Sequence, residues 1–350
     1  MSNLPPSGEI PRGAIRFNTD SNKPELWDGS QWAEFQLSTP NLGRSVDTQP
    51  GARGIYAGGM EGSPLTKTSE IDYINISSTG NAQDFGDLSF SVQNAAGFAS
   101  RTRGFVTGGE SGSSPYNPQI DIMTIASTGS SANSTKDLDV GAKYSSACSN
   151  ATRGIIHLGY VSPGANTERL DYVTMASLGD SVDYGDLTNA RRATSTCASP
   201  VRGIFSGGID GSPGTNSINF VTIATIGDAQ EFGDLVNARW DASGASNATR
   251  GIFMGGATPT NISAIESIII STGGNAKNFG DLSSVRRQSG GAASPTRAVT
   301  FGGQDGSPGT AKNEIVYVEF ATEGNPVDFG DLTTGRTWGA DGISNAHGGL

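Results

Sequence analysis

The 350-residue sequence has few of the side chains that most catalytic and metal sites need. It contains only two histidines, His157 and His347, and two cysteines, Cys148 and Cys197. Neither histidine lies in a motif that supplies a nucleophile or a carboxylate, and the HExxH, CxxC, GxSxG and P-loop spacings do not occur. We therefore expect a protein that is not an enzyme, with no catalytic residue, no metal and no cofactor.

Charge and hydropathy exclude two further classes of partner. Charged residues make up 16% of the chain and the net charge is −11, without a stripe of Lys and Arg among aromatics. Because an acidic surface repels phosphates, nucleic acid is not an expected ligand. No apolar run approaches 18 residues, and the start MSNLPPSGEIPRG lacks the pattern of a signal peptide. We expect no membrane insertion, and synthesis in a cytoplasm.

The two cysteines stand at equivalent places, five residues before Arg153 and Arg202. Cysteine is common in protein interiors as a small apolar side chain, and disulfides are rare in proteins that stay in a cytoplasm. The sequence therefore predicts two buried thiols, with a disulfide between them as the alternative.

Glycine is abundant, with 50 residues, and much of it belongs to a unit that repeats about every 48 residues from residue 51 onward. An arginine followed by a short apolar run and, in most copies, Gly-Gly opens each unit, at Arg53, Arg103, Arg153, Arg202, Arg250 and Arg297. About 30 residues later a string related to FGDL ends at Leu88, Leu138, Leu187, Leu235, Leu282 and Leu332. Two landmarks that keep the same phase establish a six-fold repeat.

Each unit reads as four short strands. Runs such as residues 120–127, 170–177 and 218–225 alternate with period two, are rich in β-branched residues and end in turns that contain glycine. A further strand consists of small residues, as at 190–199 and 238–246, which suits innermost strands that crowd around an axis. The sequence predicts an all-β fold in which residues 51–350 form a six-bladed β-propeller of four-stranded blades. A solenoid is the alternative.

The ends of the chain indicate how the ring closes. The small-residue string occurs seven times, including residues 41–49 and 335–345, whereas the other three strands occur six times each. We predict that the C-terminal strand, with Trp338 and Ile343, completes the blade that begins at Arg53, so that no edge stays open. A seventh, partial blade is the alternative.

The N-terminal segment lies outside the repeat. Residues 1–36 read as a small β-meander with a turn at Asp28 and Gly29, and residues 37–50 as a linker or first strand. The segment has too few large apolar side chains to form a core that would let it fold alone. We therefore expect it to dock on the propeller or, as we favour, to anchor the chain to another subunit. The expected anchoring residues are Ile15, Arg16, Phe17, Trp27, Trp32 and Phe35.

The loops after Gly-Gly are the longest and most unequal parts of the repeat. Glu61, Glu110, Asp210 and Asp305 occupy nearly the same point in four of them, and propeller symmetry would place these acids on one rim. Oxygen-rich loops can hold cations or polar sugars, although a solvated turn edge is the more ordinary reading. Variable loops on a rigid scaffold are also the expected place for contacts with a host surface.

The aspartates of the FGDL strings recur in every unit, which favours a structural role over a catalytic one. We expect each to accept backbone N–H bonds in a turn or to pair with an arginine. The six residues are Asp87, Asp137, Asp186, Asp234, Asp281 and Asp331.

Gly-Gly after an apolar strand, an aromatic in the outer strand and an arginine that opens the small-residue strand resemble a degenerate kelch motif; that arginine is present as Arg191, Arg239, Arg286 and Arg336. The fuller string is similar to kelch-like repeats in virion proteins of tailed bacteriophages, especially phages of marine cyanobacteria, and the resemblance covers about 300 of the 350 residues. The segment GAIRFNT followed by ELWDGSQW resembles a module common at the N-termini of phage fibre and appendage proteins. The second unit departs most, with STKDL in place of FGDL, and the third has Leu158 in place of a glycine.

This resemblance implies a structural component of a tailed-phage virion, such as a tail fibre, an appendage or a decoration protein. The N-terminal module would bind other virion proteins, and the propeller would contact a glycan or protein of the host surface. A decoration subunit without a receptor role and a carbohydrate-active propeller enzyme are the alternatives, and the small inner-strand residues argue against the enzyme. A homo-oligomer is compatible with the sequence, which does not identify the phage, the receptor or the position on the particle.

Overall fold

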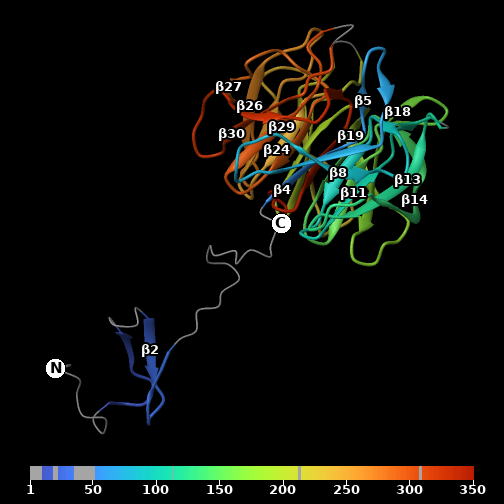
Figure 1. Cartoon of the computed structure of the whole chain (residues 1–350). Helices are drawn as coiled ribbons and strands as arrows, with labels where there is room; N and C mark the ends of the chain where they lie inside the picture. The colour runs from blue at the N-terminus through green and yellow to red at the C-terminus, as the bar shows by residue number, and fades with distance from the viewer. Residues whose placement is uncertain (1–9, 19–22, 35–51, 113, 212–213, 307–309) are drawn as a thin grey trace. The chain divides into compact units, whose positions relative to one another are not determined.

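The computed structural model describes residues 10–18, 23–34, 52–112, 114–211, 214–306 and 310–350. Within these ranges the structure contains β-strands and no helix, so the predicted all-β class is confirmed. The chain divides into two compact units, Met1–Gln49 and Pro50–Leu350 (Figure 1). No helix in the described ranges has the length and apolar character needed to cross a membrane. Residues 37–50, predicted as a linker or first strand, lie outside the described residues.

The small unit is an antiparallel sheet in the order β1-β2-β3. Its strands are β1 (Ile15–Asn18), β2 (Lys23–Trp27) and β3 (Trp32–Glu34). The predicted turn joins β2 to β3, where Asp28 Oδ1 accepts the backbone N–H groups of Ser30 at 2.7 Å and Gln31 at 2.8 Å. These hydrogen bonds, that from Gln31 above all, lower the pKa of Asp28 below its ordinary value.

Four sheets of the large unit have four antiparallel strands each. Three follow the chain: β20 (Ser195–Ala198), β21 (Arg202–Ser206), β22 (Ser217–Thr222) and β23 (Gln230–Asp234); β24 (Ser243–Ser246), β25 (Arg250–Met254), β26 (Ala264–Ile269) and β27 (Lys277–Asp281); β28 (Gly290–Ala293), β29 (Arg297–Phe301), β30 (Glu314–Glu319) and β31 (Val327–Asp331). The fourth has the order β33-β4-β7-β8, from β33 (Ala340–Ser344), β4 (Arg53–Ala57), β7 (Glu70–Asn75) and β8 (Gln83–Asp87).

The fourth sheet joins the end of the large unit to its beginning. In the antiparallel pair of β33 and β4, Ile343 lies opposite Ile55 and Ala340 opposite Ala57. Both Ile343 and Ile55 are fully buried. The predicted pairing of the C-terminal strand with the strand at Arg53 is therefore confirmed.

The second and third repeats differ from the predicted pattern, because their strands belong to a single nine-stranded sheet. Its strands are β10 (Ala96–Ala99), β11 (Arg103–Thr107), β13 (Asn117–Thr124), β14 (Ala132–Lys143), β15 (Ser146–Ser149), β16 (Arg153–His157), β17 (Tyr160–Val161), β18 (Ala165–Thr174) and β19 (Val182–Arg191). The short β17 joins the two repeats, since Val161 lies opposite Ala142 of β14 and Ala165 of β18. The other short strands are β5 (Met60–Glu61), β6 (Thr66–Lys67), β9 (Val92–Gln93), β12 (Glu110–Ser111) and β32 (Arg336–Thr337).

The small-residue strands touch one another in a cyclic order: β33, β10, β15, β20, β24, β28 and again β33. Their side chains are small because neighbouring backbones leave no room. A Cβ at Gly244 would stand 2.0 Å from the carbonyl oxygen of Thr196, and one at Gly291 would stand 2.2 Å from that of Gly244. The six strands that the sequence predicts as innermost thus pack against each other.

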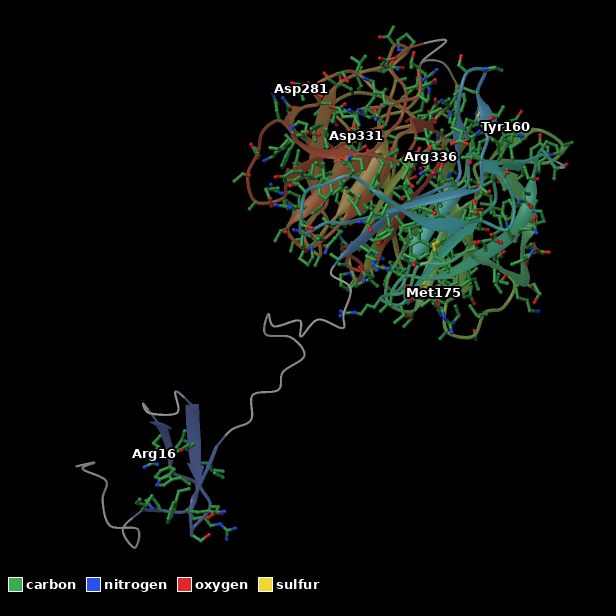
Figure 2. All side chains as sticks on the ribbon, in the orientation of Figure 1. Arg16, Tyr160, Met175, Asp281, Asp331 and Arg336 are labelled. Atoms are coloured by element: carbon green, nitrogen blue, oxygen red, sulfur yellow. The ribbon has the colours of Figure 1, made fainter. Side chains whose placement is uncertain are left out.

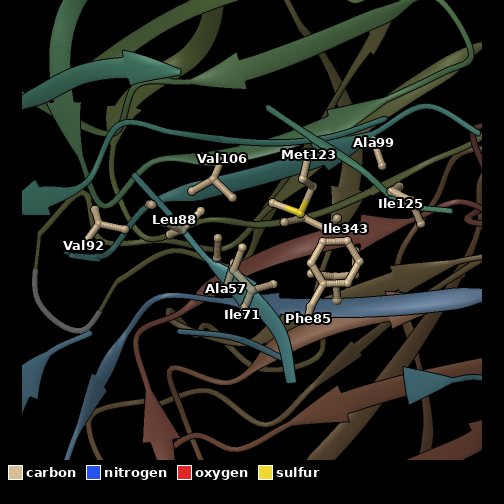
Figure 3. Packing of buried hydrophobic residues seen from close by; sticks show 13 residues of the cluster. Ala57, Ile71, Phe85, Leu88, Val92, Ala99, Val106, Met123, Ile125 and Ile343 are labelled. Carbon is tan, nitrogen blue, oxygen red and sulfur yellow. The ribbon is translucent and has the colours of Figure 1, made fainter. Parts of the chain in front are cut away.

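The hydrophobic core lies between neighbouring sheets. Figure 3 shows one cluster, in which Ile71 and Phe85 of the first repeat pack with Val106 and Met123 of the second. Six such clusters occur within the described residues, one for each pair of neighbouring repeats, and that of the last and first repeats includes Phe301 and Tyr56. Burying one Ile or Phe side chain contributes about 2–3 kcal/mol, so the repeats stabilise one another.

The FGDL string joins the last strand of one repeat to a loop of the neighbouring repeat. Gly233 has φ +150°, and a Cβ there would stand 2.5 Å from the carbonyl carbon of Gly274 in the next repeat. The following N–H, of Asp234, donates to Asn275 Oδ1 at 3.0 Å. Corresponding bonds run from the N–H of Asp87, Asp137, Asp186, Asp281 and Asp331 to a side-chain oxygen of the adjoining repeat. In these bonds the backbone N–H of the aspartate donates, whereas the prediction was that its carboxylate accepts backbone N–H groups or pairs with an arginine.

The arginines of the kelch-like motif are buried, and they form ion pairs or hydrogen bonds with polar side chains. The guanidinium of Arg239 pairs with Glu266, with each side chain 1% exposed, and Nη1 donates at 2.9 Å to the carbonyl oxygen of Gly255. Arg336 pairs with Asp72 at 2.5 Å, whereas Arg191 donates to the amide oxygen of Asn219 at 2.9 Å. Burial lowers the pKa of Arg191 to about 10, so it remains charged at neutral pH.

Candidate functional site

The predicted anchoring residues divide between the two faces of the small sheet. Arg16 Nε donates to Glu25 Oε2 at 2.7 Å, and its guanidinium carbon lies 4.2 Å from the centroid of the Trp32 ring (Figure 2). Trp27 and Trp32 lie opposite each other, with ring centroids 5.5 Å apart. Ile15 follows the alternation of the strand to the other face, where it is 68% exposed.

The structure therefore brings Arg16, Trp27 and Trp32 together and leaves Ile15 apart from them. Phe17 belongs to β1, but its side chain lies outside the described residues, as does the whole of Phe35. Trp27 is buried within the small unit, whereas Trp32 is half-buried.

Three of the predicted rim acids, Glu110, Asp210 and Asp305, pair with other polar side chains. Glu110 accepts from Lys67 Nζ at 2.9 Å and from Lys143 Nζ at 3.1 Å. Although burial raises the pKa of Glu110, these two lysines outweigh it and hold the pKa below its ordinary value. Across the described residues, no three Asp, Glu, His or Cys side chains are grouped so as to hold a metal ion.

The other three rim acids differ in their surroundings. Asp210 Oδ2 accepts from the amide of Asn189 at 3.1 Å, and Asp305 lies 3.5 Å from Lys312 Nζ. Glu61 has one buried oxygen, Oε2, that finds no hydrogen-bond partner in the part of the chain that the structure describes. Glu110, Asp210 and Asp305 thus make separate polar contacts, each with a different partner.

The histidines and cysteines are buried, and burial keeps their side chains uncharged at neutral pH. His157 Nε2 lies 3.0 Å from the carbonyl oxygen of Thr167, and burial lowers the pKa of His157 to about 3. Burial also raises the pKa of Cys148 to about 12, which leaves its thiol protonated and unreactive. Cys148 and Cys197 are free and buried, which confirms the prediction of two buried thiols.

A cavity of about 30 Å³, which we call the inner cavity, is lined by the strands β15, β20, β24, β28 and by Gly342 of β33. The C-terminal residues line it as well. His347 Nε2 lies 2.9 Å from the carbonyl oxygen of Ala99, and Gly348 N–H donates to that of Ser246 at 2.7 Å. Burial lowers the pKa of His347 to about 4, so this imidazole is neutral at pH 7.

A second cavity of about 60 Å³, which we call the mouth pocket, is lined by residues that directly precede the inner strands. At its rim one residue of each repeat has a positive φ of 52° to 59°: Asn94, Tyr144, Ala193, Asp241, Gln288 and Trp338. Backbone N–H groups join five successive pairs of them, from Asn94 to Trp338, Trp338 to Gln288, Gln288 to Asp241, Asp241 to Ala193, and Ala193 to Tyr144. The pocket is thus framed by a nearly complete ring of hydrogen bonds.

The mouth pocket carries polar groups that fit a small polar ligand. Burial raises the pKa of Asp241 to about 6, against the effect of a 2.9 Å hydrogen bond that Gln288 Nε2 donates to it. Trp338 Nε1 and Ser289 Oγ are buried and make no hydrogen bond within the described residues. The residues that line this pocket thus include an acid, an amide, a hydroxyl and an indole.

The mouth pocket was not predictable from the sequence, because the six framing positions carry six different residue types and no motif marks them. Alignment of the repeats on the small-residue strands was the available signal. No protein-family model matches this sequence, and a comparison with curated proteins finds no match. The kelch-like resemblance and its functional implications therefore stay predictions.

Proposed function

We propose that the large unit is a six-bladed β-propeller, with the sheet β33-β4-β7-β8 as the blade that closes it. The cyclic order of contacts between the inner strands supports this architecture. The hydrophobic clusters support it too, because each pair of neighbouring repeats shares one, including the last and the first. In this proposal the nine-stranded sheet consists of two blades that β17 joins.

We further propose that the protein is a non-enzymatic component of a tailed-phage virion, in which the small unit anchors the chain to another virion protein. The observation that carries this proposal is the edge strand β1, whose Ile15 is 68% exposed in a sheet of three short strands. An exposed edge strand with a large apolar side chain is suited to pairing with another chain. The neutral, internally bonded histidines give further support to a structural rather than a catalytic role.

In this proposal the large unit projects from the particle, as part of a tail fibre, an appendage or a decoration, and contacts a glycan or protein of the host surface. The loops that carry Glu61, Glu110, Asp210 and Asp305 are the proposed contact region, because they differ most among the repeats. A subunit without a receptor role is the competing proposal. Both share the same anchoring step and differ only in binding to host cells.

The anchoring proposal is tested on intact particles. Antibodies raised against residues 50–350 should label purified phage particles at a defined position in electron micrographs. A phage that encodes Ile15→Asp should incorporate less of the protein, because a charge on β1 opposes strand pairing. Absence of the chain from purified particles would overturn the proposal, and labelled particles whose large unit fails to bind host cells would favour the competing decoration role.

A further inference from the structure

The second and third repeats carry a group of aromatic and cationic side chains that the repeat itself does not explain. We call it the tyrosine cluster: Tyr116, Tyr144, Tyr160, Lys143 and Arg192. The rings of Tyr116 and Tyr160 are stacked, with centroids 6.2 Å apart and planes at 23°, and Tyr144 meets Tyr160 edge-on at 6.5 Å. Figure 2 labels Tyr160 on the large unit.

Two cations lie over these rings. Lys143 Nζ is 5.2 Å from the ring centroid of Tyr116, and the guanidinium carbon of Arg192 is 5.1 Å from that of Tyr160. Lys143 is already paired with Glu110, whereas Arg192 donates only through Nη1, to the amide oxygen of Asn166 at 2.6 Å. In the part of the chain that the structure describes, Nε and Nη2 of Arg192 make no hydrogen bond, so they can bind an anion.

The cluster departs from the repeat at Tyr116 and Tyr160, whereas Lys143 and Arg192 stand at equivalent positions, directly before Tyr144 and Ala193. The loops that hold Tyr116 and Tyr160 correspond to IDGSPGTNS and QDGSPGTAKN in later repeats, which contain no aromatic residue. All three tyrosines are partly exposed, and none belongs to a hydrophobic core cluster of the described residues. A set of half-buried aromatics that the core does not use is typical of a ligand-binding surface.

The tyrosine cluster is continuous with the mouth pocket, because Tyr144 belongs to both. Beside Tyr144 the pocket is lined by Asp241, Gln288, Ser289 and Trp338. The surface therefore combines flat apolar rings, a cation with free donors, and a pocket of neutral and acidic hydrogen-bonding groups within reach of one ligand.

We propose that the tyrosine cluster and the mouth pocket form a binding site for an acidic saccharide, that is, a sugar ring that carries a carboxylate or a sulfate. A sugar ring fits against the exposed part of Tyr116 or Tyr160, and the oxygens of the anionic group pair with the free nitrogens of Arg192. The hydroxyl groups fit the donors and acceptors of the mouth pocket. A nucleic acid fits less well, since the net charge of −11 opposes a polyanion.

This inference specifies the ligand class for the host contact in the proposed function and rests on that function for its biological meaning. The binding step is nevertheless measured on the purified full chain, without a particle. Failure of sugar binding would thus leave the virion role open, and failure to find the chain on particles would leave the sugar site standing.

The test uses isothermal titration of the full chain with glucuronic acid and galactose 6-sulfate, and with glucose and galactose as their neutral counterparts. Sodium sulfate and a ten-residue oligothymidylate serve as further probes. At least one acidic sugar should bind about tenfold or more tightly than its neutral counterpart, because the charge-assisted bonds to Arg192 are lost with the latter. Added NaCl should weaken the preference.

Four variants locate the site. Arg192→Gln should reduce binding of the acidic sugar to the level of the neutral one, whereas Lys277→Gln, which removes one positive charge from an exposed position of β27, should have no effect. Tyr160→Ala should weaken binding of both kinds of sugar about tenfold, and Tyr160→Phe should retain it because the ring face remains. Thermal melting of each variant establishes that it is folded.

The proposal is overturned if none of the four sugars binds, if acidic and neutral sugars bind equally, or if Arg192→Gln and Tyr160→Ala bind like the unaltered chain. Sulfate that binds as tightly as galactose 6-sulfate would reduce the site to an anion site and also contradict the proposal. Tighter binding of the oligothymidylate than of any sugar would point to a nucleic acid instead.

Discussion

The backbone N–H of Asp331 donates a 3.1 Å hydrogen bond to Oδ1 of Asn81, and so joins the last repeat to the first. The same bond, at 3.0 Å, links Asp234 to Asn275 and Asp281 to Asn325 inside the repeat array. The contact between the last and the first repeat therefore has the same geometry as the contacts between consecutive repeats. This equivalence indicates that loss of one such contact has the same consequence wherever it occurs.

Gly233 of the FGDL string lies so close to Gly274 that we expect one added methyl group to reduce the stability of the fold. Gly233→Ala should destabilise the fold by about 1–3 kcal/mol more than Gly227→Ala, because of overpacking against Gly274. The pair is matched, since φ is +150° at Gly233 and +151° at Gly227, but a Cβ at Gly227 meets nothing within 4 Å. Urea denaturation of both variants measures the difference, and equal stabilities would contradict the role given to this contact.

Removal of residues 336–350 should abolish the single cooperative melting transition of the large unit. The truncation deletes β33, which buries Ile343 beside β4, and Arg336, which pairs with buried Asp72. Differential scanning calorimetry of the truncated chain provides the test. A shorter deletion of residues 345–350 leaves β33 in place and serves as the control, so it should retain a cooperative transition. An unchanged melt of the longer deletion would refute closure by β33.

The buried pair of Arg239 and Glu266 predicts a strongly destabilising substitution. Glu266→Ala should cost about 3–5 kcal/mol of the free energy of unfolding, because it leaves the guanidinium buried without its carboxylate. Glu314→Ala should cost less, since the Glu314 partner of Arg286 is 34% exposed and water can replace it. Denaturant titration of both variants checks the order, and the reverse order would be incompatible with burial as the cause.

The two buried histidines predict loss of stability in acid. Burial depresses the pKa of His157 to about 3 and that of His347 to about 4, so between these values and about 6.5 the unfolded chain binds protons that the folded chain does not. Each histidine therefore reduces stability as the pH falls below about 6.5, by up to about 1.4 kcal/mol per pH unit.

Substitution of both histidines should flatten this dependence. The double variant His157→Gln/His347→Gln is expected to lose less stability between pH 6.5 and pH 4.5 than the unaltered chain, although it starts from a lower stability at pH 7. Urea midpoints at several pH values provide the measurement. Parallel pH profiles of the two proteins would show that other groups govern the acid response.

The local sequence pattern was sufficient to predict the repeat, the strands and the closing strand. Alternation of apolar residues depends only on the two-residue period of a strand, and the surplus small-residue string at 335–345 left one strand to pair with β4. The joining of the second and third repeats into one sheet was not predictable in this way. The strand that joins them, β17, consists only of Tyr160 and Val161, and two residues are too few to show a period.

The candidate sites were less predictable than the fold. The rim acids share a position in their loops, but their partners, such as Lys67 and Lys143 for Glu110, come from other loops and strands. The tyrosine cluster likewise assembles Tyr116, Tyr144 and Tyr160 from three separate segments. A single sequence does not reveal such neighbours, because they depend on the packing of whole repeats.

By itself, the sequence determined that this protein is a repeated all-β structure with its small residues in one strand of each repeat, because steric fit and side-chain alternation are local properties. Only the tertiary structure decided which residues meet. The backbone contact of Asp331 with Asn81, the pairing of Arg239 with Glu266 and the grouping of aromatics around Tyr144 all join positions that are far apart in the chain. Their energies arise from burial and distance, which exist only once the repeats have packed together.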